Sequence, residues 1–188
     1  DIKNEMKAWI DIQLVAFPQD GLMRAASQEN LLRALDMGVE VVGGIPHFER
    51  TMSDGAESIR ILCEIAAKRA LMIDMHCDES DDPMSRHIET LCMETSRLGL
   101  EGRVAGSHLT SMHSMDNYYV SKLLPLMGEA EISVIANPLI NITLQGRNDS
   151  YPKRRGMTRV PEQMAAGLNV AFGHDCVMDP WYPLGSHD

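Results

Sequence analysis

The chain lacks the features that would mark a membrane protein or a nucleic-acid-binding protein. No apolar run reaches the roughly 18 residues that a membrane-spanning helix needs, and no signal peptide is visible. Basic residues are scarce: 17 Lys and Arg stand against 27 Asp and Glu, which gives a formal net charge of −10. Because binding to phosphate needs a basic face, we expect neither nucleic acid nor membrane as a partner.

Short-spaced cysteine and glycine signatures are missing as well. The four cysteines (Cys63, Cys77, Cys92 and Cys176) form no Cys-x-x-Cys pair and lie in or beside apolar segments. This usage is typical of reduced thiols, so we expect a cytoplasmic protein. No Gly-rich phosphate loop follows an apolar run, which weakens a nucleotide-binding interpretation.

The chain does contain a regular alternation of short apolar segments and amphipathic segments. Predicted strands cover residues 10–16, 39–43, 70–76, 103–108, 131–136 and 168–172. Predicted helices cover residues 28–37, 54–69 with Ser53 as the cap, 85–98, 117–127 and 160–166, and a long polar loop covers 137–159. Six such units predict an α/β fold with a parallel sheet, either an open doubly wound sheet or a (β/α)₈ barrel.

Residues 71–79 are the stretch on which the functional interpretation depends. An apolar run ends in His76, and Glu79 follows three residues later. A helix is one interpretation, since residues i and i+3 share a helical face. We expect a strand instead, because the run is short and a polar, Pro-containing segment follows it. A neutral imidazole can bind a divalent metal, and a nearby carboxylate can move a proton beside it.

Candidate functional residues stand at or just past the carboxyl ends of five of the six predicted strands. They are Gln19, His47, His76, Glu79, His108 and Asp175. Barrel enzymes keep their catalytic residues at the carboxyl ends of the strands, so this distribution favours the barrel. A complete barrel needs about eight units and about 250 residues, so we expect residues 1–188 to form one catalytic domain that is an incomplete barrel.

His76, His108 and Asp175 form a candidate metal site. Two imidazoles and a carboxylate suit Zn²⁺ or Fe(II), and water bound to such a metal is a nucleophile near neutral pH. Each residue also has a plainer interpretation: His76 as a hydrogen-bonded histidine at a strand end, Asp175 as a helix N-cap and His108 as a structural side chain. Glu79 could be a solvated loop carboxylate. Gln19 is either a turn residue or an amide that pairs with an amide-like ring edge.

The remaining polar residues are interpreted as structural. We expect His47 and His113 either in loops or behind the site, in contact with its residues but not with the substrate. We expect His87 to be exposed on a helix. The cluster Lys153-Arg154-Arg155 is either a solvated face that pairs with carboxylates or a contact between subunits. A loop as long as residues 137–159 is functional or disordered.

Across essentially the whole chain, the motifs resemble those of the cytosine deaminases of the amidohydrolase superfamily. The motifs are Val15-Ala16-Phe17-Pro18-Gln19, Ile45-Pro46-His47-Phe48-Glu49, Asp74-Met75-His76-Cys77-Asp78-Glu79, Ser107-His108, Asn137-Pro138-Leu139, Leu144-Gln145-Gly146-Arg147, Tyr151-Pro152-Lys153-Arg154-Arg155-Gly156, Phe172-Gly173-His174-Asp175 and Asp179-Pro180-Trp181-Tyr182-Pro183-Leu184-Gly185. The resemblance implies a metal-dependent hydrolase barrel of which about strands 3 to 8 are present, and a homo-oligomer.

The resemblance also implies a role for each candidate catalytic residue. His76 matches a metal ligand on the fifth barrel strand. Asp175 matches the aspartate that ligates the metal and takes the proton of the attacking water. Glu79 matches the acid/base that carries a proton to the ring and to the leaving amine. His108 matches the histidine that polarises the water or the intermediate more than it binds metal.

Substrate recognition follows from the same resemblance. Gln19 matches the glutamine that reads the substrate carbonyl and the neighbouring ring nitrogen, and Trp181 matches an aromatic of the pocket wall. Cys176 stands where the family usually has a second aspartate, beside the C5 edge of the pyrimidine. A thiol is smaller and less polar than a carboxylate, so we expect a preference for 5-methylcytosine, with cytosine as a poorer substrate.

Two missing motifs bear on this resemblance: one is a departure from the family, and the other separates the chain from other deaminases. The family's His-x-His pair on the first strand is absent, so we expect the chain to be the central part of a longer polypeptide. The other zinc deaminases combine His-x-Glu with Pro-Cys-x-x-Cys, and no Pro-Cys-x-x-Cys occurs here, which separates the chain from them. No basic groove for a nucleic-acid strand is evident, so the expected substrate is a free base. Two different functions stay open: a deaminase of another amino-heterocycle such as isoguanine, or an inactive, metal-free relative that acts through assembly.

Overall fold

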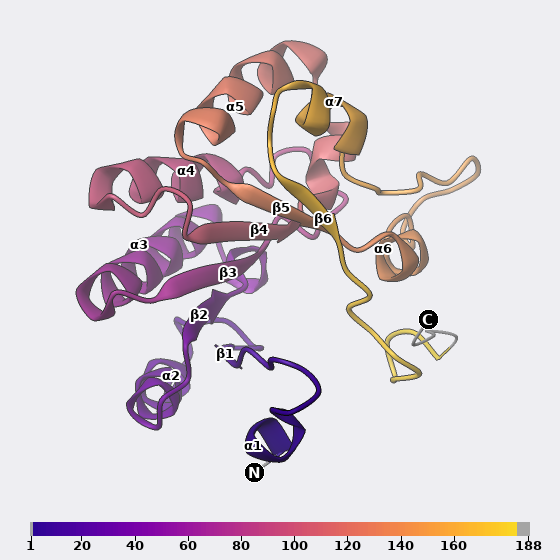
Figure 1. The fold of residues 1–188 in the computed structure, drawn as a ribbon. Coiled ribbons are helices and arrows are strands. Elements are labelled where there is room, and N and C mark those ends of the chain that lie inside the picture. Colours follow the sequence, from indigo (N-terminus) through magenta and orange to yellow (C-terminus); the bar gives the residue numbers. More distant parts are fainter. Residues whose placement is uncertain (1, 184–188) are drawn as a thin grey trace.

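The centre of the computed structural model, which describes residues 2–183, is a parallel sheet of six strands (Figure 1). The strands are β1 (Val15–Ala16), β2 (Val41–Gly44), β3 (Met72–Cys77), β4 (Val104–His108), β5 (Ser133–Ala136) and β6 (Val170–Phe172). They pair in chain order, each one parallel to the next. In a doubly wound sheet the order of the strands reverses at a switch point, whereas in a barrel each new strand is added beside the previous one. The prediction of an incomplete barrel is therefore confirmed.

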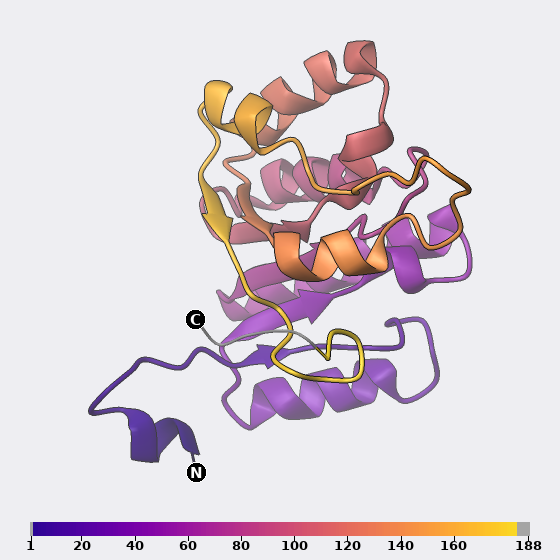
Figure 2. The same cartoon turned by 90° about the vertical axis from the view of Figure 1, so that its right-hand side faces the viewer.

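Helices cover one face of this sheet and leave the other face open. They are α1 (Ile2–Met6), α2 (Ser27–Asp36), α3 (Met52–Arg69), α4 (His87–Leu98), α5 (Asn117–Glu129), α6 (Pro138–Leu144) and α7 (Val160–Ala165), with 3-10 turns η1 (Pro46–Phe48) and η2 (Thr110–Ser114). In Figure 1, α3, α4 and α5 follow one another along the same side of the strands. Seen along the strands in Figure 2, α6 lies across the centre, beyond the strand ends.

The two faces of β3 show why the sheet has this arrangement. Ile73, Met75 and Cys77 are buried and belong to the apolar core between the sheet and the helices. The alternate residues of β3 are less buried and point to the barrel interior, since successive side chains of a strand face opposite sides. His76 therefore lies on the interior face at the carboxyl end of β3.

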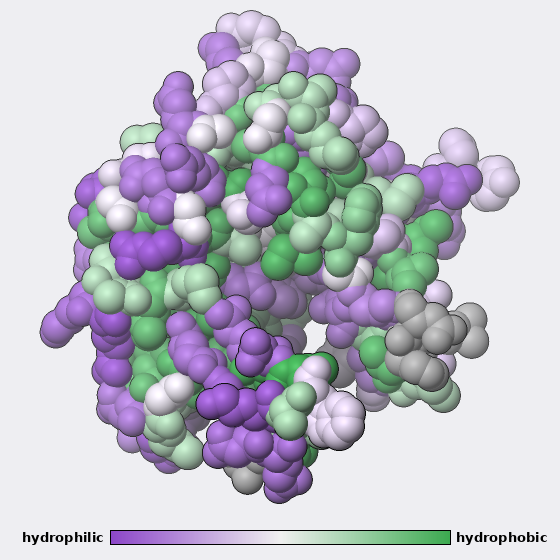
Figure 3. All heavy atoms as spheres, in the orientation of Figure 1, coloured by the Kyte–Doolittle hydropathy of each residue, from purple (hydrophilic) through white to green (hydrophobic). Residues whose placement is uncertain are grey.

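Exposed apolar residues mark the edge of the sheet. β6 pairs only with β5 among the described strands, and Phe172 on it is 68% exposed. Figure 3 shows apolar side chains gathered over α7 and β6, on a face that elsewhere mixes polar and apolar side chains. Within residues 2–183, no helix has both the length and the apolar character that a membrane crossing requires.

The structure corrects four local predictions. Only Val15–Ala16 of residues 10–16 pair as a strand, because this edge segment has a partner on one side only. Thr51 caps α3 in place of Ser53, by accepting a hydrogen bond of 3.0 Å from the amide of Asp54. The predicted loop 137–159 contains α6. His87 is 3% exposed, so the expectation of an exposed histidine is wrong.

Candidate active site

Three strands bring His76, His108 and Asp175 together at one end of the sheet. His76 and His108 end β3 and β4, and Asp175 follows β6. Nε2 of His76 lies 3.9 Å from Oδ1 of Asp175, and Nε2 of His108 lies 4.0 Å from the same oxygen. One ligand atom from each residue can be chosen so that all three lie within 4.8 Å of one another. Residues 32 to 99 positions apart in the sequence thus share one small volume.

The backbone at these strand ends has a left-handed conformation that residues other than glycine rarely adopt. His108 has φ of 73° and Asp175 has φ of 65°, and Asp78, between His76 and Glu79, has φ of 53°. Left-handed φ is uncommon for residues other than glycine and tends to occur where the surrounding structure needs a particular side-chain direction. Here it ends the strands and brings the side chains of His108 and Asp175 together, whereas the Asp78 side chain points away from the cavity to the start of α4.

The neutral ring of His108 is oriented by two amides. Nδ2 of Asn141, on α6, lies 3.0 Å from Nδ1 of His108, and Nδ2 of Asn137, after β5, lies 3.3 Å from Nε2. Burial, reinforced by the charges of His76 and His47, lowers the pKa of His108 to about 3. Each amide nitrogen is a donor, and a neutral imidazole accepts at one nitrogen only, so the ring accepts from either Asn141 at Nδ1 or Asn137 at Nε2; Nε2 is on the side that faces Asp175.

Glu79 lies against His108 and holds a proton more tightly than an ordinary glutamate. Its Oε1 lies 3.2 Å from Nδ1 of His108, and Asn141 donates to the same oxygen at 3.1 Å. Burial raises the pKa of Glu79 to about 8, and the nearby charge of Asp175 adds to this, while the Asn141 hydrogen bond opposes it. A carboxyl group with this pKa can give up and take back a proton near neutral pH.

A cavity of about 450 Å³ opens over these groups. Its lining residues are Gln19, Ile45, Phe48, His76, Glu79, Ile140, Leu144, Gln145, Arg147, Asp175, Cys176, Asp179 and Trp181. Of the seven site residues that the sequence predicts, six are in this lining, and His108 lies beneath it, fully buried. Apolar walls with a few convergent polar groups, at this volume, are typical of a small-molecule site.

The residues present fit a divalent transition metal. The donors are two imidazoles and one carboxylate, a set that suits Zn²⁺ or Fe(II). Burial lowers the pKa of His76, against the opposing charges of Asp74 and Asp175, so its ring is neutral and its Nε2 can be a ligand. Its Nδ1 is buried without a hydrogen-bond partner among the described residues, which leaves the orientation of the ring to packing against Phe17, whose ring centroid is 4.5 Å away.

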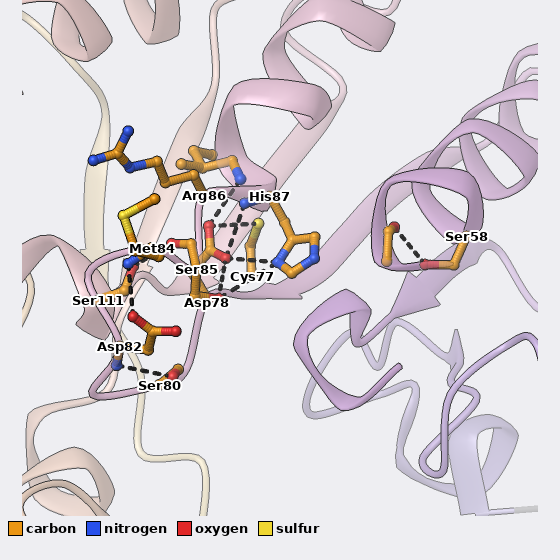
Figure 4. Close-up of polar contacts among 12 residues, drawn as sticks. Ser58, Cys77, Asp78, Ser80, Asp82, Met84, Ser85, Arg86, His87 and Ser111 are labelled. Atoms are coloured by element: carbon orange, nitrogen blue, oxygen red, sulfur yellow. Dashed lines mark hydrogen bonds and ion pairs between the residues drawn. The ribbon is translucent and has the colours of Figure 1, made fainter. Parts of the chain in front are cut away.

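Two residues that shape the site give no signal of their role in the sequence. Asn141 lies in a stretch that the sequence predicts as loop, although the motif Asn137-Pro138-Leu139 is visible just before it. Asp78 shows in the sequence only as part of the strand end. It is fully buried and accepts hydrogen bonds from Ser85, His87 and Ile88 (Figure 4). Burial alone would raise the pKa of Asp78, but the hydrogen bond and charge of His87 hold it below its usual value.

His47, on η1, is a half-buried, neutral residue near the site whose two ring nitrogens are buried. Burial lowers its pKa to about 4, with smaller contributions from Asp78, which raises the pKa, and from His87 and His76, which lower it. Its ring contacts Phe48 edge-on, with 5.3 Å between centroids. His113 is exposed on η2, away from the cavity lining. The prediction that both lie in short loops agrees with these positions, because each belongs to a 3-10 turn after a strand.

Known proteins match this chain in family profile, in sequence and in structure. The profile of the amidohydrolase family matches residues 2–188. The structure of 5-methylcytosine deaminase from Klebsiella pneumoniae liganded with 5-fluorocytosine superimposes with a TM-score of 0.97 at 46% identity, covering 100% of this chain and 46% of that one. N-isopropylammelide isopropylaminohydrolase from Burkholderia multivorans superimposes with a TM-score of 0.81 at 25% identity, covering 98% of this chain and 44% of that one.

A curated relative with a different stated substrate is also similar. Pterin deaminase from Rhizobium rhizogenes is 28% identical over 190 aligned residues, which cover 100% of this chain and 43% of the relative. The chain therefore spans less than half the length of these similar proteins.

Proposed function

The chain belongs to the amidohydrolase family, and on that premise we propose that the protein removes the amine of a free pyrimidine base by hydrolysis, with 5-methylcytosine preferred over cytosine. The products are thymine or uracil and ammonia. The likeness to 5-methylcytosine deaminase supports the reaction, and a cavity that takes one small ring supports a free base.

Cys176 carries the proposed preference for the methylated base. It lines the cavity directly after Asp175 and is 8% exposed. Burial, with hydrogen bonds and charge from Asp179 and Asp175, raises the pKa of the thiol to about 12, so the side chain is neutral. A neutral thiol tolerates an apolar substituent that a carboxylate at this place would not. One methyl group in a fitted pocket contributes about 1–3 kcal/mol, or roughly 10- to 200-fold in kcat/KM.

His76 and Asp175 are the proposed metal ligands, and His108 is close enough to serve as a third donor. A zinc or ferrous ion held there would supply a Lewis acid that makes water a nucleophile near neutral pH. In the tautomer that carries the ring proton on Nε2, His108 would not bind the metal at that nitrogen and would instead donate a hydrogen bond toward the space in front of Asp175. The Asp175 carboxylate accepts the proton of the attacking water.

Glu79 supplies and removes protons on the substrate side. Its carboxyl group lines the cavity and, with a pKa of about 8, is protonated at pH 7. It gives that proton to the ring nitrogen beside the carbon under attack. It then carries the water proton held by Asp175 to the departing amine. As ammonia leaves, the added hydroxyl group gives its remaining proton back to Glu79 and becomes the product carbonyl. Because Asn141 bonds both Glu79 and His108, it keeps the proton donor and the water-polarising group at a fixed distance from each other.

Gln19 and Trp181 are proposed to recognise the ring. Gln19 offers an amide donor and acceptor to a carbonyl and the neighbouring nitrogen, as a cytosine ring presents them. Trp181 is 56% exposed at the rim, where its indole can cover one face of a bound base. A pyrimidine without the paired polar edge would leave the Gln19 amide unpaired and would be rejected.

Steady-state ammonia release from a panel of free bases tests this function in the natively expressed full-length protein. The panel contains 5-methylcytosine, cytosine, isoguanine, a pterin and ammelide, and each is compared by kcat/KM. The proposal expects 5-methylcytosine to exceed cytosine by roughly 10- to 200-fold. A kcat/KM for cytosine equal to or above that for 5-methylcytosine contradicts it.

A second candidate is deamination of a larger amino-heterocycle such as isoguanine or a pterin. Two observations favour it: the similarity to pterin deaminase and the volume of the cavity, about 450 Å³. In the same panel this candidate predicts that a bicyclic base has the highest kcat/KM. An inactive relative that acts through assembly predicts no ammonia from any base and no bound transition metal.

A further inference from the structure

A buried carboxylate and a buried imidazole lie directly behind the candidate acid/base. Asp78, the residue before Glu79, is fully buried, and Nδ1 of His87 lies 2.9 Å from its Oδ1. The hydroxyl of Ser85 donates to the same oxygen at 2.7 Å. The cavity lining does not include Asp78 or His87, so neither reaches a bound substrate. Figure 4 shows this group between the end of β3 and the start of α4.

The Asp78 carboxylate replaces a missing helix cap. Arg86, at the N-cap position of α4, makes no capping hydrogen bond with its side chain. The first two amides of the helix, those of His87 and Ile88, donate instead to Asp78 at 3.0 and 2.8 Å. A buried carboxylate is costly unless it is hydrogen-bonded, and the positive end of a helix is a favourable place for one. These bonds tie the end of β3 to α4.

The backbone of the same residue ties β3 to the turn that follows β4. The carbonyl of Asp78 accepts hydrogen bonds from the amide of Ser111 at 3.0 Å and from the hydroxyl of Thr110 at 3.2 Å. The neighbouring carbonyl, that of Cys77, accepts from the amide of Leu109 at 3.1 Å. Because His108 directly precedes Leu109, these bonds set the distance between the strand end that carries Glu79 and the one that carries His108.

The chain makes room for the imidazole of His87 by placing a glycine against it. Gly55, in the first turns of α3, has no Cβ, and a Cβ built there would overlap Nε2 of His87 and lie 2.7 Å from the carbonyl oxygen of Pro46. Glycine in a helix costs about 1 kcal/mol relative to alanine. In Figure 4 the ring of His87 points from α4 toward the helix that carries Ser58, which is α3.

From these contacts we infer that Asp78 and His87 form a buried carboxylate–imidazole pair that positions Glu79 against His108. Both are positioning residues and neither touches the substrate. The inference rests on the proposed function, because it assigns the pair a purpose in the proton transfer by Glu79. Partners of this kind that orient catalytic and ligand groups typically change activity about 10- to 100-fold when they are removed.

Two variants of His87 test the pair. His87→Phe keeps a planar ring and removes the Nδ1 donor, whereas His87→Asn keeps an amide N–H near the Nδ1 position. We expect His87→Phe to lower kcat for the best base about 10- to 100-fold with little change in KM, and His87→Asn to recover most of it. Metal content, measured on the purified full-length protein, should be the same in both.

Thr95→Val is the matched control on the same helix. Thr95 is fully buried on α4 and donates to the carbonyl of Leu91 at 2.7 Å, so its loss removes one buried hydrogen bond far from the loop of Glu79. We expect its kcat to stay within twofold of the wild type, a margin of about 0.4 kcal/mol. A His87→Phe enzyme with wild-type kcat overturns the inference. Equal losses in His87→Phe, His87→Asn and Thr95→Val also overturn it, because general destabilisation would explain them.

Hydrogen exchange separates a failure of this inference from a failure of the proposed function. If the wild-type protein deaminates none of the bases, the function is wrong, and the pair is then judged by the amides of Ile88 and Ser111, which bond to Asp78. Faster exchange at both amides in His87→Phe than in Thr95→Val supports a positioning pair. Equal exchange in the two variants overturns it.

Discussion

Oε1 of Glu79 and Nδ1 of His108 lie 3.2 Å apart, and the amide nitrogen of Asn141 is within hydrogen-bond distance of both, at 3.1 and 3.0 Å. One amide group on α6 thus fixes the candidate proton carrier and the candidate water-polarising group together. The contact joins the ends of β3 and β4 to a helix that follows β5. Chemistry at this place depends on three separate units of the barrel being folded against one another.

Glu79→Gln tests the proton carrier. A glutamine side chain still accepts the hydrogen bond from Asn141, but it cannot give up and regain a proton. We expect kcat to fall about 10²- to 10⁴-fold, the usual contribution of general acid–base catalysis, with the bound metal unchanged. Steady-state kinetics and metal analysis measure both. Glu129→Gln, at the exposed end of α5, is the control, and a Glu79→Gln enzyme with near-wild-type kcat would remove Glu79 from the mechanism.

Cys176→Asp tests the basis of the base preference. A carboxylate in this part of the cavity is larger and more polar than the thiol, so we expect the ratio of kcat/KM for 5-methylcytosine over cytosine to fall at least about tenfold. Cys176→Ser, which keeps a small neutral side chain, should leave the preference for the methylated base in place. An unchanged ratio in Cys176→Asp would show that other residues set the preference.

Much of the fold was predictable from the sequence, because hydrophobic period and strand-end residues are local signals. The positions of His76 and Asp175 after apolar runs indicated parallel strands whose ends meet, and the sheet order agrees. Asn141 was not predictable in this way. It lies in the segment predicted as a loop, of which residues 138–144 form α6, and its importance comes from a contact with Glu79, which is 62 residues away.

The error at His87 has a related cause. Periodicity places it at the start of a helix, and a histidine there is usually solvated. Its burial depends on Asp78 from a different strand and on the missing side chain of Gly55. Tertiary contacts of this kind leave no local pattern in the sequence. Asp78 itself was visible in the family motif 74–79, but its contact with His87 was not.

His76→Ala tests the metal centre without relying on turnover. Removing one of three donors should lower the metal bound per chain, and with it the rise in melting temperature that zinc gives by binding the folded state. Elemental analysis and thermal unfolding with and without added zinc measure these effects. His113→Ala removes an exposed histidine on η2 and should change neither. Equal metal content in His76→Ala and the wild type would contradict the proposed ligand set.

Cys63 and Cys92 give a prediction for stability at high pH. Burial raises the pKa of each thiol to about 12, with the charge of Glu94 as a further cause at Cys63. Because the unfolded thiol titrates near about 8.5, the folded state holds the proton more tightly, and this stabilisation is complete below that pH. As pH rises from about 8.5 toward 12, the free energy of unfolding should fall by on the order of 1 kcal/mol per pH unit for each of the two thiols.

Urea unfolding at a series of pH values between 7.5 and 10 measures this loss. A Cys63→Ala, Cys92→Ala double variant should show a flatter dependence of unfolding free energy on pH than the wild type. Alkylation by iodoacetamide at pH 8 should be slow in the folded protein and rapid in urea, because only the thiolate reacts. Rapid alkylation of both thiols in the folded protein would contradict their burial.

Arg154→Lys tests whether the loop over the cavity depends on one guanidinium. Nε and Nη2 of Arg154 pair with the two carboxylate oxygens of Asp149 at 2.7 and 2.8 Å. Its Nη1 donates to the carbonyl of Asp81 at 2.6 Å and to the hydroxyl of Ser114 at 3.1 Å. The side chain therefore joins the loop after α6 to the segments after β3 and β4. Of the two interpretations of the basic cluster 153–155, pairing with carboxylates is the one that Arg154 follows.

A lysine cannot reproduce this pattern, because its ammonium is a single point and cannot bind a carboxylate with two parallel hydrogen bonds. Gln145 and Arg147, which line the cavity, belong to the loop that Arg154 ties down. We expect Arg154→Lys to raise KM more than it lowers kcat, and to speed limited proteolysis between residues 145 and 156. Arg155→Lys, at the exposed neighbouring position, is the matched control. If both variants keep the wild-type KM and cleavage rate, other contacts hold the loop, and the position of Gln145 in the cavity does not depend on Arg154.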